Sequence, residues 1–153
     1  MPTGSTSIEI DASAREVFEL IHDYSRRLDW DPFLREAVLL HGATSADHAV
    51  TCRCSARRLA GGSSMEARYV AFKPASVAAV KMTRGPFFLK TFAASIRHCS
   101  SGDSASRVTY KYNFRCSPSW LAGLIEPIVQ LVFQYETERR LKGLKKYLES
   151  RHR

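Results

Sequence analysis

The sequence has no apolar run long enough to cross a bilayer, which takes ~20 residues. Its longest apolar stretch, residues 121–132, is interrupted by Gly123, Glu126, Pro127 and Gln130. Residues 1–7 contain no basic region followed by an apolar run, so no signal peptide is expected. These absences argue against the integral membrane and secreted classes, and we expect a cytoplasmic protein.

Cysteine is scarce and is not spaced for a metal site, since the four are Cys52, Cys54, Cys99 and Cys116. Zinc sites use longer ligand spacings and a second ligand pair, whereas a single residue separates Cys52 from Cys54. In a strand these two side chains would point to the same face. We therefore expect no metal, and we interpret the cysteines as reduced, half-buried thiols that pack like small apolar residues.

The short motifs that identify common catalytic and nucleotide-binding sites are also absent. The sequence contains no Gly-x-Ser-x-Gly, no P-loop, no Gly-x-Gly-x-x-Gly and no His-Glu-x-x-His. Its five histidines stand in no motif that names a role. We expect no cofactor, and motifs alone assign no catalytic residue.

Acidic residues are outnumbered, with 15 against 23 basic ones, and the net charge is +8. Seven of the basic residues gather between positions 139 and 153. We interpret this cluster as a solvated helix end, because positive charge is favourable at a helix C-terminus. RNA recognition usually needs exposed aromatics among the basic residues, and the basic clusters here lack them. We expect no nucleic-acid partner, and the charge leaves contact with a membrane surface open.

Near the N-terminus, local patterns predict one strand and two short helices. Residues 7–11 alternate apolar and polar side chains, as a short strand does. Ser13 and Glu16 form a capping-box pattern, which predicts a helix from there to about residue 23. A second helical turn is expected at 25–28, and Pro32 marks a turn after it because the residue before a proline disfavours helix.

Residues 33–116 carry the pattern of strands separated by turns. The predicted strands cover residues 33–40, 48–59, 64–73, 76–83, 87–98 and 107–116. The last is the clearest, because Val108, Tyr110, Tyr112 and Phe114 share one face and polar residues take the other. A face this aromatic is expected to be buried, with the opposite face in water.

A long helix is predicted over residues 120–149, with apolar residues at helical spacing. Such a helix would be ~40–45 Å long. Pro127 should kink it or mark its true start. Since only this helix is large enough to cover the apolar side of the sheet, residues 1–153 are predicted to form one α+β domain. A helix laid in a curved antiparallel sheet need not fill the concavity, so an apolar cavity can open between them.

The two ends of the chain resemble a known family. The strand at 7–11, the helix start Ala-Ser-Ala-Arg-Glu-Val-Phe at 12–18, the turn Trp30-Asp31-Pro32 and the ending at 141–149 are similar to the START-like (Bet v 1-like) superfamily, polyketide cyclase/dehydrase branch. The resemblance implies a helix-grip fold, in which a sheet of about seven antiparallel strands surrounds a long C-terminal helix. It also implies a ligand cavity between them, but no universal catalytic motif.

The candidate ligand-binding residues are the aromatic and apolar side chains expected to face this cavity. Trp30 and Phe33 are placed near its mouth, as pocket aromatics or as anchors of the turn. Two tyrosines in succession on one face indicate either polar ligand contacts or hydrogen bonds to the long helix. The remaining candidates are Tyr69, Phe92, Ile96, Tyr110, Tyr112, Phe114, Leu124, Ile128, Leu131 and Tyr135.

Four residues are weak candidates for proton transfer. Tyr110 and Tyr112 carry hydroxyl groups on the apolar face, and His98 and Lys90 share the phase of Phe92 and Ile96. Exposed strand ends are the simpler interpretation of His98 and Lys90, because lysine is seldom buried.

The leading functional prediction is binding or carriage of a hydrophobic small molecule such as a lipid, polyketide or quinone. The alternative is a polyketide aromatase/cyclase or dehydratase, which needs shape and one or two proton-transfer groups. A third hypothesis is a module that contacts membrane or RNA through Arg53, Arg57, Arg58 and the C-terminal cluster. The sequence indicates neither the ligand nor the oligomeric state.

Overall fold

The computed structural model of the chain describes residues 2–58, 62–102 and 104–151. Within these ranges the elements follow the predicted α+β order of a strand, two short helices, six strands and a long helix. They are β1 Thr3–Ile10, α1 Ala14–Ile21, α2 Arg27–Trp30, β2 Leu34–Leu39, β3 Thr51–Ala56, β4 Ser64–Lys73, β5 Val77–Arg84, β6 Leu89–Ser100, β7 Ser106–Cys116 and α3 Ala122–Arg151.

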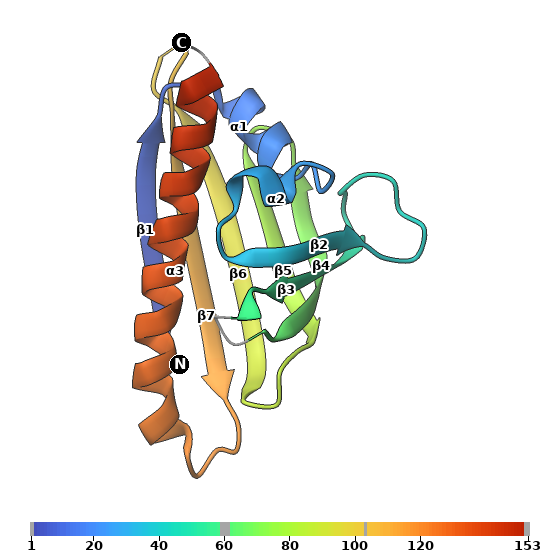
Figure 1. The fold of residues 1–153 in the computed structure, drawn as a ribbon, viewed down its shortest axis with the longest axis vertical. Coiled ribbons are helices and arrows are strands. Elements are labelled where there is room, and N and C mark those ends of the chain that lie inside the picture. Colours follow the sequence, from blue (N-terminus) through green and yellow to red (C-terminus); the bar gives the residue numbers. More distant parts are fainter. Residues whose placement is uncertain (1, 59–61, 103, 152–153) are drawn as a thin grey trace.

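The seven strands form one sheet in the order β1-β7-β6-β5-β4-β3-β2, and all neighbouring strands are antiparallel. Figure 1 shows that β2 and β3 run across the direction of β1 and β7, so the sheet is strongly curled. In the same view α3 lies along β1 and β7. This arrangement confirms the predicted helix-grip fold.

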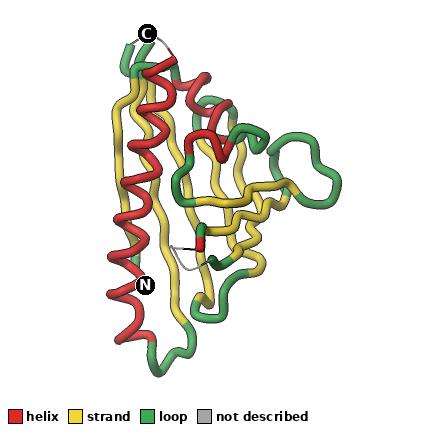
Figure 2. Tube along the Cα trace, in the orientation of Figure 1, coloured by secondary structure: helices red, strands yellow, loops and turns green. Residues whose placement is uncertain are grey.

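The two short helices close one end of the curled sheet, beside the C-terminal end of α3 (Figure 2). Ser13 caps α1 as predicted, because its Oγ accepts a hydrogen bond from the backbone N–H of Glu16 at 3.2 Å. The apolar face of α1 then packs into a buried cluster that includes Val17, Val108 and Leu144. Sequence capping and tertiary packing therefore agree at this end of the molecule.

The register of β6 and β7 builds the aromatic face that the sequence predicted. Phe92 pairs with Phe114, and Ile96 pairs with Tyr110. A β-bulge between Leu89 and Thr91 breaks the alternation at the start of β6. Since a bulge adds one unpaired residue, Leu89 is buried and Lys90 is exposed. The prediction that Lys90 shares the phase of Phe92 is wrong for this reason.

The face that α3 turns to the sheet differs from the predicted one. Its buried residues are Val129, Thr137, Leu141, Leu144 and Leu148, joined by the partly buried Ile125 and Phe133. Leu124, Leu131 and Tyr135 are 73%, 72% and 61% exposed, so the prediction that they face the sheet is wrong.

The prediction for α3 fails because the first half of this helix carries apolar residues on several faces. The helical phase is set by Leu141, Leu144 and Leu148 near the other end. Steps of three or four residues back from Leu141 lead to Thr137, Phe133 and Val129. Within the described residues, no helix is long and apolar enough to span a membrane.

Candidate functional site

A cavity of about 320 Å³ lies between the curled sheet and the first half of α3. Most of its wall is apolar, with contributions from Met65, Val80, Phe92 and Ile96 on the strands and Phe133 on α3. Small-molecule sites usually measure ~300–1,000 Å³. The volume suits a compact ligand of one or a few rings or a short chain.

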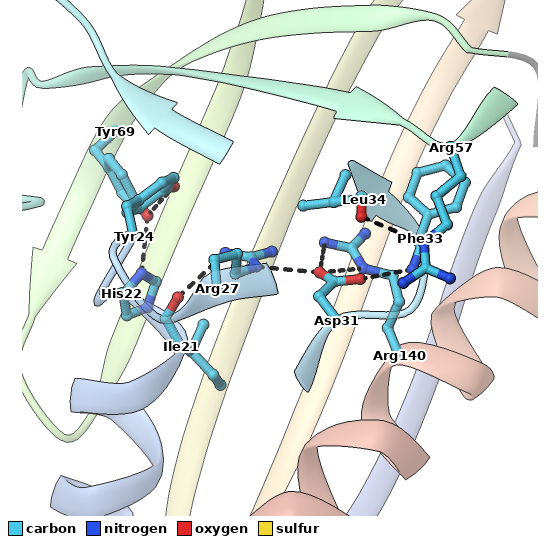
Figure 3. A network of polar contacts seen from close by, with 10 residues as sticks. All are labelled: Ile21, His22, Tyr24, Arg27, Asp31, Phe33, Leu34, Arg57, Tyr69 and Arg140. Atoms are coloured by element: carbon cyan, nitrogen blue, oxygen red, sulfur yellow. Dashed lines mark hydrogen bonds and ion pairs between the residues drawn. The ribbon is translucent and has the colours of Figure 1, made fainter. Parts of the chain in front are cut away.

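Polar side chains gather on the wall beside α1 and α2. Arg27 and Tyr24 come from this region, Tyr69 and Tyr110 from the sheet, and Arg140 from α3. Figure 3 shows four of these groups, Tyr24, Arg27, Tyr69 and Arg140, with the ion pairs on one side and the hydroxyls of Tyr24 and Tyr69 on the other. The cavity is therefore apolar with one polar wall.

Two arginines on this wall share one carboxylate. Asp31 Oδ2 accepts from Arg27 Nε at 3.1 Å and from Arg140 Nε at 3.0 Å, while Oδ1 accepts from the backbone N–H of Phe33 at 3.0 Å. The Asp31 side chain is fully buried, and those of Arg27 and Arg140 are 8% and 19% exposed. Burial alone would raise the pKa of the Asp31 carboxyl, but Arg140 and Arg27 outweigh it and lower the pKa. The group carries one more positive than negative charge.

A second polar chain joins α1 to β4. His22 Nδ1 lies 2.8 Å from the Tyr69 hydroxyl, which lies 2.8 Å from the Tyr24 hydroxyl. Burial lowers the pKa of His22 to about 3, with smaller contributions from Arg27 and His98. Burial likewise raises the pKa of Tyr69. The chain is therefore neutral, and at ordinary pH its hydroxyls act as hydrogen-bond groups rather than bases.

The two tyrosines of β7, Tyr110 and Tyr112, have different surroundings. The hydroxyl of Tyr112 donates to Gln134 Oε1 at 3.1 Å and accepts from Gln130 Nε2 at 3.2 Å, so it is engaged by α3. Tyr110 lines the cavity, and within the described ranges its hydroxyl has no hydrogen-bond partner. Burial raises the pKa of Tyr110. Tyr110 is thus the hydroxyl of β7 that a ligand can reach.

Seven of the twelve predicted ligand-binding residues line this cavity. They are Phe33, Tyr69, Phe92, Ile96, Tyr110, Tyr112 and Ile128.

The other five predicted residues lie outside the cavity wall. Leu124, Leu131 and Tyr135 are on the exposed side of α3. Trp30, the last residue of α2, is buried with the Arg27 guanidinium 5.0 Å from its ring centroid, and it borders a separate hollow of about 20 Å³. Phe114 is fully buried against Phe133, with ring centroids 5.1 Å apart, because α3 closes over the sheet at that point. Trp30 and Phe114 are therefore structural anchors in this fold.

Of the four weak proton-transfer candidates, only the tyrosines reach the cavity wall. Lys90 is exposed, as the bulge dictates. His98 is buried but lies against Phe18, with ring centroids 5.3 Å apart, and neither ring nitrogen has a hydrogen-bond partner among the residues that the structure describes. The expectation that His98 sits at an exposed strand end is therefore wrong, although it does not line the cavity either.

Sequence reasoning missed most of the polar wall. Sequence patterns place Asp31 in a turn and Arg140 in a solvated basic cluster. Arg140 lies 109 positions from Asp31, so no local pattern could bring them together. A weak signal existed at Cys52 and Cys54, whose shared strand face was predicted and which both line the cavity.

Comparison with known proteins agrees with the architecture. The family described as polyketide cyclase / dehydrase and lipid transport matches residues 1–149. No curated protein matches the sequence.

Several solved structures share the fold at low sequence identity. The Zhui aromatase/cyclase from Streptomyces sp. R1128 is 15% identical, with a TM-score of 0.84 and coverage of 99% of this chain and 96% of that one. A START superfamily protein from Mycobacterium smegmatis is 12% identical, with a TM-score of 0.79 and 97% coverage of both chains. A norcoclaurine synthase point mutant from Thalictrum flavum is 10% identical, with a TM-score of 0.73 and coverage of 99% and 96%.

These likenesses establish the fold, and the family match extends over nearly the whole chain. Together with the cavity under α3, they support a hydrophobic ligand-binding or cyclase role. The chain belongs to the polyketide cyclase / dehydrase and lipid transport family.

Proposed function

We propose that this protein binds and carries a hydrophobic small molecule of the lipid, polyketide or quinone class, acting as one ligand-binding domain. The supporting observation is an apolar cavity whose single polar wall holds Arg27, Arg140 and the free hydroxyl of Tyr110. The apolar wall supplies affinity at ~25 cal/mol per Å² of buried ligand surface. The cations and the hydroxyl favour a ligand with an oxygen-bearing or anionic end, because an unpaired polar group in that wall costs free energy.

Gentle native mass spectrometry of freshly purified protein, followed by solvent extraction, tests this function first. A co-purified small molecule supports the carrier role and names its class. Thermal denaturation with a panel of fatty acids, quinones and aromatic polyketide analogues tests it independently. A ligand at 100 times its Kd adds ~2.7 kcal/mol of stability, or roughly 5–10 °C for a chain of this size. An apo spectrum together with no thermal shift across the panel would contradict the proposal.

Filling the cavity provides a matched pair of variants on one strand. Ala94 is buried and lines the cavity, whereas its neighbour Ala93 does not. We predict that Ala94→Trp abolishes the ligand-induced thermal shift and that Ala93→Trp retains it. Circular dichroism of both variants checks that the fold is intact. Equal loss of the thermal shift in both variants would contradict binding of the ligand in this cavity.

The polar end of the ligand can be tested at Tyr110 without changing the shape of the cavity. We predict that Tyr110→Phe weakens binding of a ligand acid by ~2–10-fold, since one hydrogen bond contributes ~0.5–1.5 kcal/mol. Binding of the corresponding hydrocarbon, in which a methyl group replaces the carboxyl group, should be unchanged. Tyr112→Phe is the control, because α3 already engages that hydroxyl. An identical effect of the two changes on acid affinity would argue against a polar end at Tyr110.

An aromatase/cyclase or dehydratase role is the second candidate. It is favoured by the polar wall, which could hold and polarise a ketone, and by the fold shared with an aromatase/cyclase. Tyr110 is the proton-transfer candidate that combines a cavity position with a free hydroxyl. Cyclisation of a poly-β-ketone analogue by the native protein, with loss of activity in Tyr110→Phe, would support it. Unchanged product distribution with and without protein would eliminate it.

Membrane contact also stays a prediction, and the structure favours a different surface for it than the sequence did. Arg53 pairs with Glu36, and Arg57 donates to the Leu34 carbonyl. Exposed apolar side chains instead occur beside the cavity, where Ile128 and Val132 are 64% and 47% exposed and also line it. Flotation with anionic and neutral liposomes tests this contact, and no flotation with either composition would dismiss it.

A further inference from the structure

Two of the four cysteines lie side by side inside the cavity. Cys52 and Cys54 are on one face of β3 and both line the cavity wall. Cys52 pairs with Ala67 on the neighbouring strand β4. Ala67 also lines the cavity. All four cysteines of the chain are free thiols.

The surroundings of this pair are unlike those of an inert packing cysteine. Tyr24, Arg27 and Arg140 line the same cavity as the two cysteines. The charge of Arg27 acts on both thiols and that of Arg140 on Cys54. The remaining titratable neighbours are Tyr69 and Tyr110. The described groups around the pair are thus two cations and three neutral hydroxyls. Of the carboxylates nearby, Asp31 is already held by both arginines, and Glu136, which lines the cavity from α3, pairs with Arg139.

This environment makes the first ionisation of the pair easy and the second difficult. The neighbouring Cys54 thiol is the main cause that lowers the pKa of Cys52 to about 6, helped by Tyr24 and Arg27. The neighbouring Cys52 and burial raise the pKa of Cys54. One thiolate shared by the pair is the expected state at neutral pH, and a thiolate is the nucleophilic form of cysteine.

The other two cysteines lack these features. Cys99 is exposed near the end of β6, and Cys116 is buried outside the cavity. Burial raises the pKa of Cys116, and Glu126 raises it further. They provide one accessible and one inaccessible control within the same chain.

We propose that Cys52 and Cys54 form a nucleophilic site in the cavity that adds to electrophilic ligands of the α,β-unsaturated carbonyl or quinone class. In this step the thiolate sulfur forms a bond to the β-carbon, and the carbon–carbon π pair moves to the carbonyl oxygen as an enolate. The α-carbon then takes up one proton, equal to the proton that the thiol lost, so no oxidant is needed. Arg27, Arg140 and Tyr110 line the same cavity and suit the negative oxygen of the enolate.

This site goes beyond reversible carriage, and it requires only that a small electrophile enters the cavity. N-ethylmaleimide, a compact conjugated imide, is the probe, and N-ethylsuccinimide is the saturated control that cannot add a thiol. Both are incubated with folded Cys99→Ser protein, and adducts are located by intact mass and peptide mapping. We expect one N-ethylmaleimide adduct on Cys52 or Cys54 and none with N-ethylsuccinimide.

The pH profile separates an activated pair from an ordinary thiol. Between pH 6.5 and 7.5 we expect the labelling rate of Cys99→Ser protein to rise less than ~2-fold. The rate for N-acetylcysteine, a thiol with a pKa of ~8.5, should rise ~10-fold over the same range. Adding Cys52→Ser and Cys54→Ser should remove the adduct from folded protein. The same test is made with Cys52→Ala and Cys54→Ala, in case a serine substitution disturbs folding. Circular dichroism checks that each variant is folded.

Labelling of folded Cys99→Ser protein only at Cys116, only after denaturation, or with the steep pH profile of N-acetylcysteine would overturn the proposal. The carrier function has separate readouts in native mass spectrometry and ligand-induced thermal shift. Labelling without any bound ligand would leave this inference standing while the carrier function fails. Ligand binding without labelling at Cys52 or Cys54 would support the carrier function and contradict this inference.

Discussion

Asp31 is the residue on which the polar wall depends most. It is fully buried, and it is the carboxylate that both Arg27 and Arg140 contact in the described structure. A buried ion pair adds little stability over a well-packed apolar pair, but removing one partner leaves a buried charge without compensation. The contribution of Asp31 therefore lies in permitting two cations to be buried beside the cavity.

We predict that Asp31→Ala lowers the free energy of unfolding by ~3–5 kcal/mol, because two buried cations lose their counter-ion. Arg140→Met should cost less, since it leaves the Arg27–Asp31 pair at 3.1 Å intact and neutral. Urea denaturation followed by circular dichroism measures both. If the two substitutions cost the same, the shared carboxylate is not what allows the arginines to be buried.

At the scale of elements, the position of α3 is set by its contact with the α2 region. A Cβ at Gly143 would lie 2.6 Å from the Trp30 carbonyl oxygen and 3.2 Å from Pro32 Cδ. The backbone of α3 can approach the turn at Trp30 this closely because residue 143 has no side chain. The same close approach brings Arg140, one turn earlier, to Asp31.

We predict that Gly143→Ala destabilises the protein by ~1–3 kcal/mol through overpacking, although alanine is favoured over glycine in helices by ~1 kcal/mol. Gly123→Ala is the matched control on the same helix, because outside the local helix backbone no described atom lies within 4 Å of its added Cβ. That change should be neutral or stabilise by up to ~1 kcal/mol. Chemical denaturation of both variants checks the sign. Stabilisation by both changes would show that α3 can move away from the turn at no cost.

For the molecule as a whole, two buried histidines couple folding to pH. Burial lowers the pKa of His22 to about 3 and that of His98 to about 4, from an ordinary value of 6.5. The unfolded chain therefore takes up protons at both rings below pH 6.5, whereas the folded chain does not until the pH approaches these lower values. Stability from the neutral rings is fully present above pH 6.5 and is lost as the pH falls from 6.5 toward 4 and 3.

We predict that unfolding free energy drops by about 1–2 kcal/mol for each histidine between pH 7 and pH 5. His98→Phe should remove about half of this loss, because its neighbour Phe18 already provides an aromatic environment. His48→Gln at an exposed position is the control and should leave the slope as it is. Urea midpoints measured at half-unit pH steps give the slope. A native protein equally stable at pH 5 and 7 would refute the assignment of buried neutral rings.

Features that depend on neighbours within a few residues can be predicted from the order of amino acids alone. The Ser13 cap is one, since the Ser13 side chain accepts a hydrogen bond from the backbone N–H of Glu16, three residues further on. The aromatic face of β7 is another, because side chains alternate along any strand. These local patterns, together with the order of the elements and the resemblance at the two ends of the chain, were enough to predict a helix-grip fold.

Which side chains meet in the cavity depends on packing between elements that are far apart in the chain. Apolar residues surround the first half of α3, so local periodicity could not choose between the face of Leu124 and Leu131 and that of Val129 and Phe133. The choice came from packing at the far end of the helix, where Leu144 is fully buried. The meeting of Arg140 with Asp31 likewise depends on how far the sheet curls and where α3 crosses the turn. Those distances arise from contacts made across the whole molecule, which spacing along the chain does not encode.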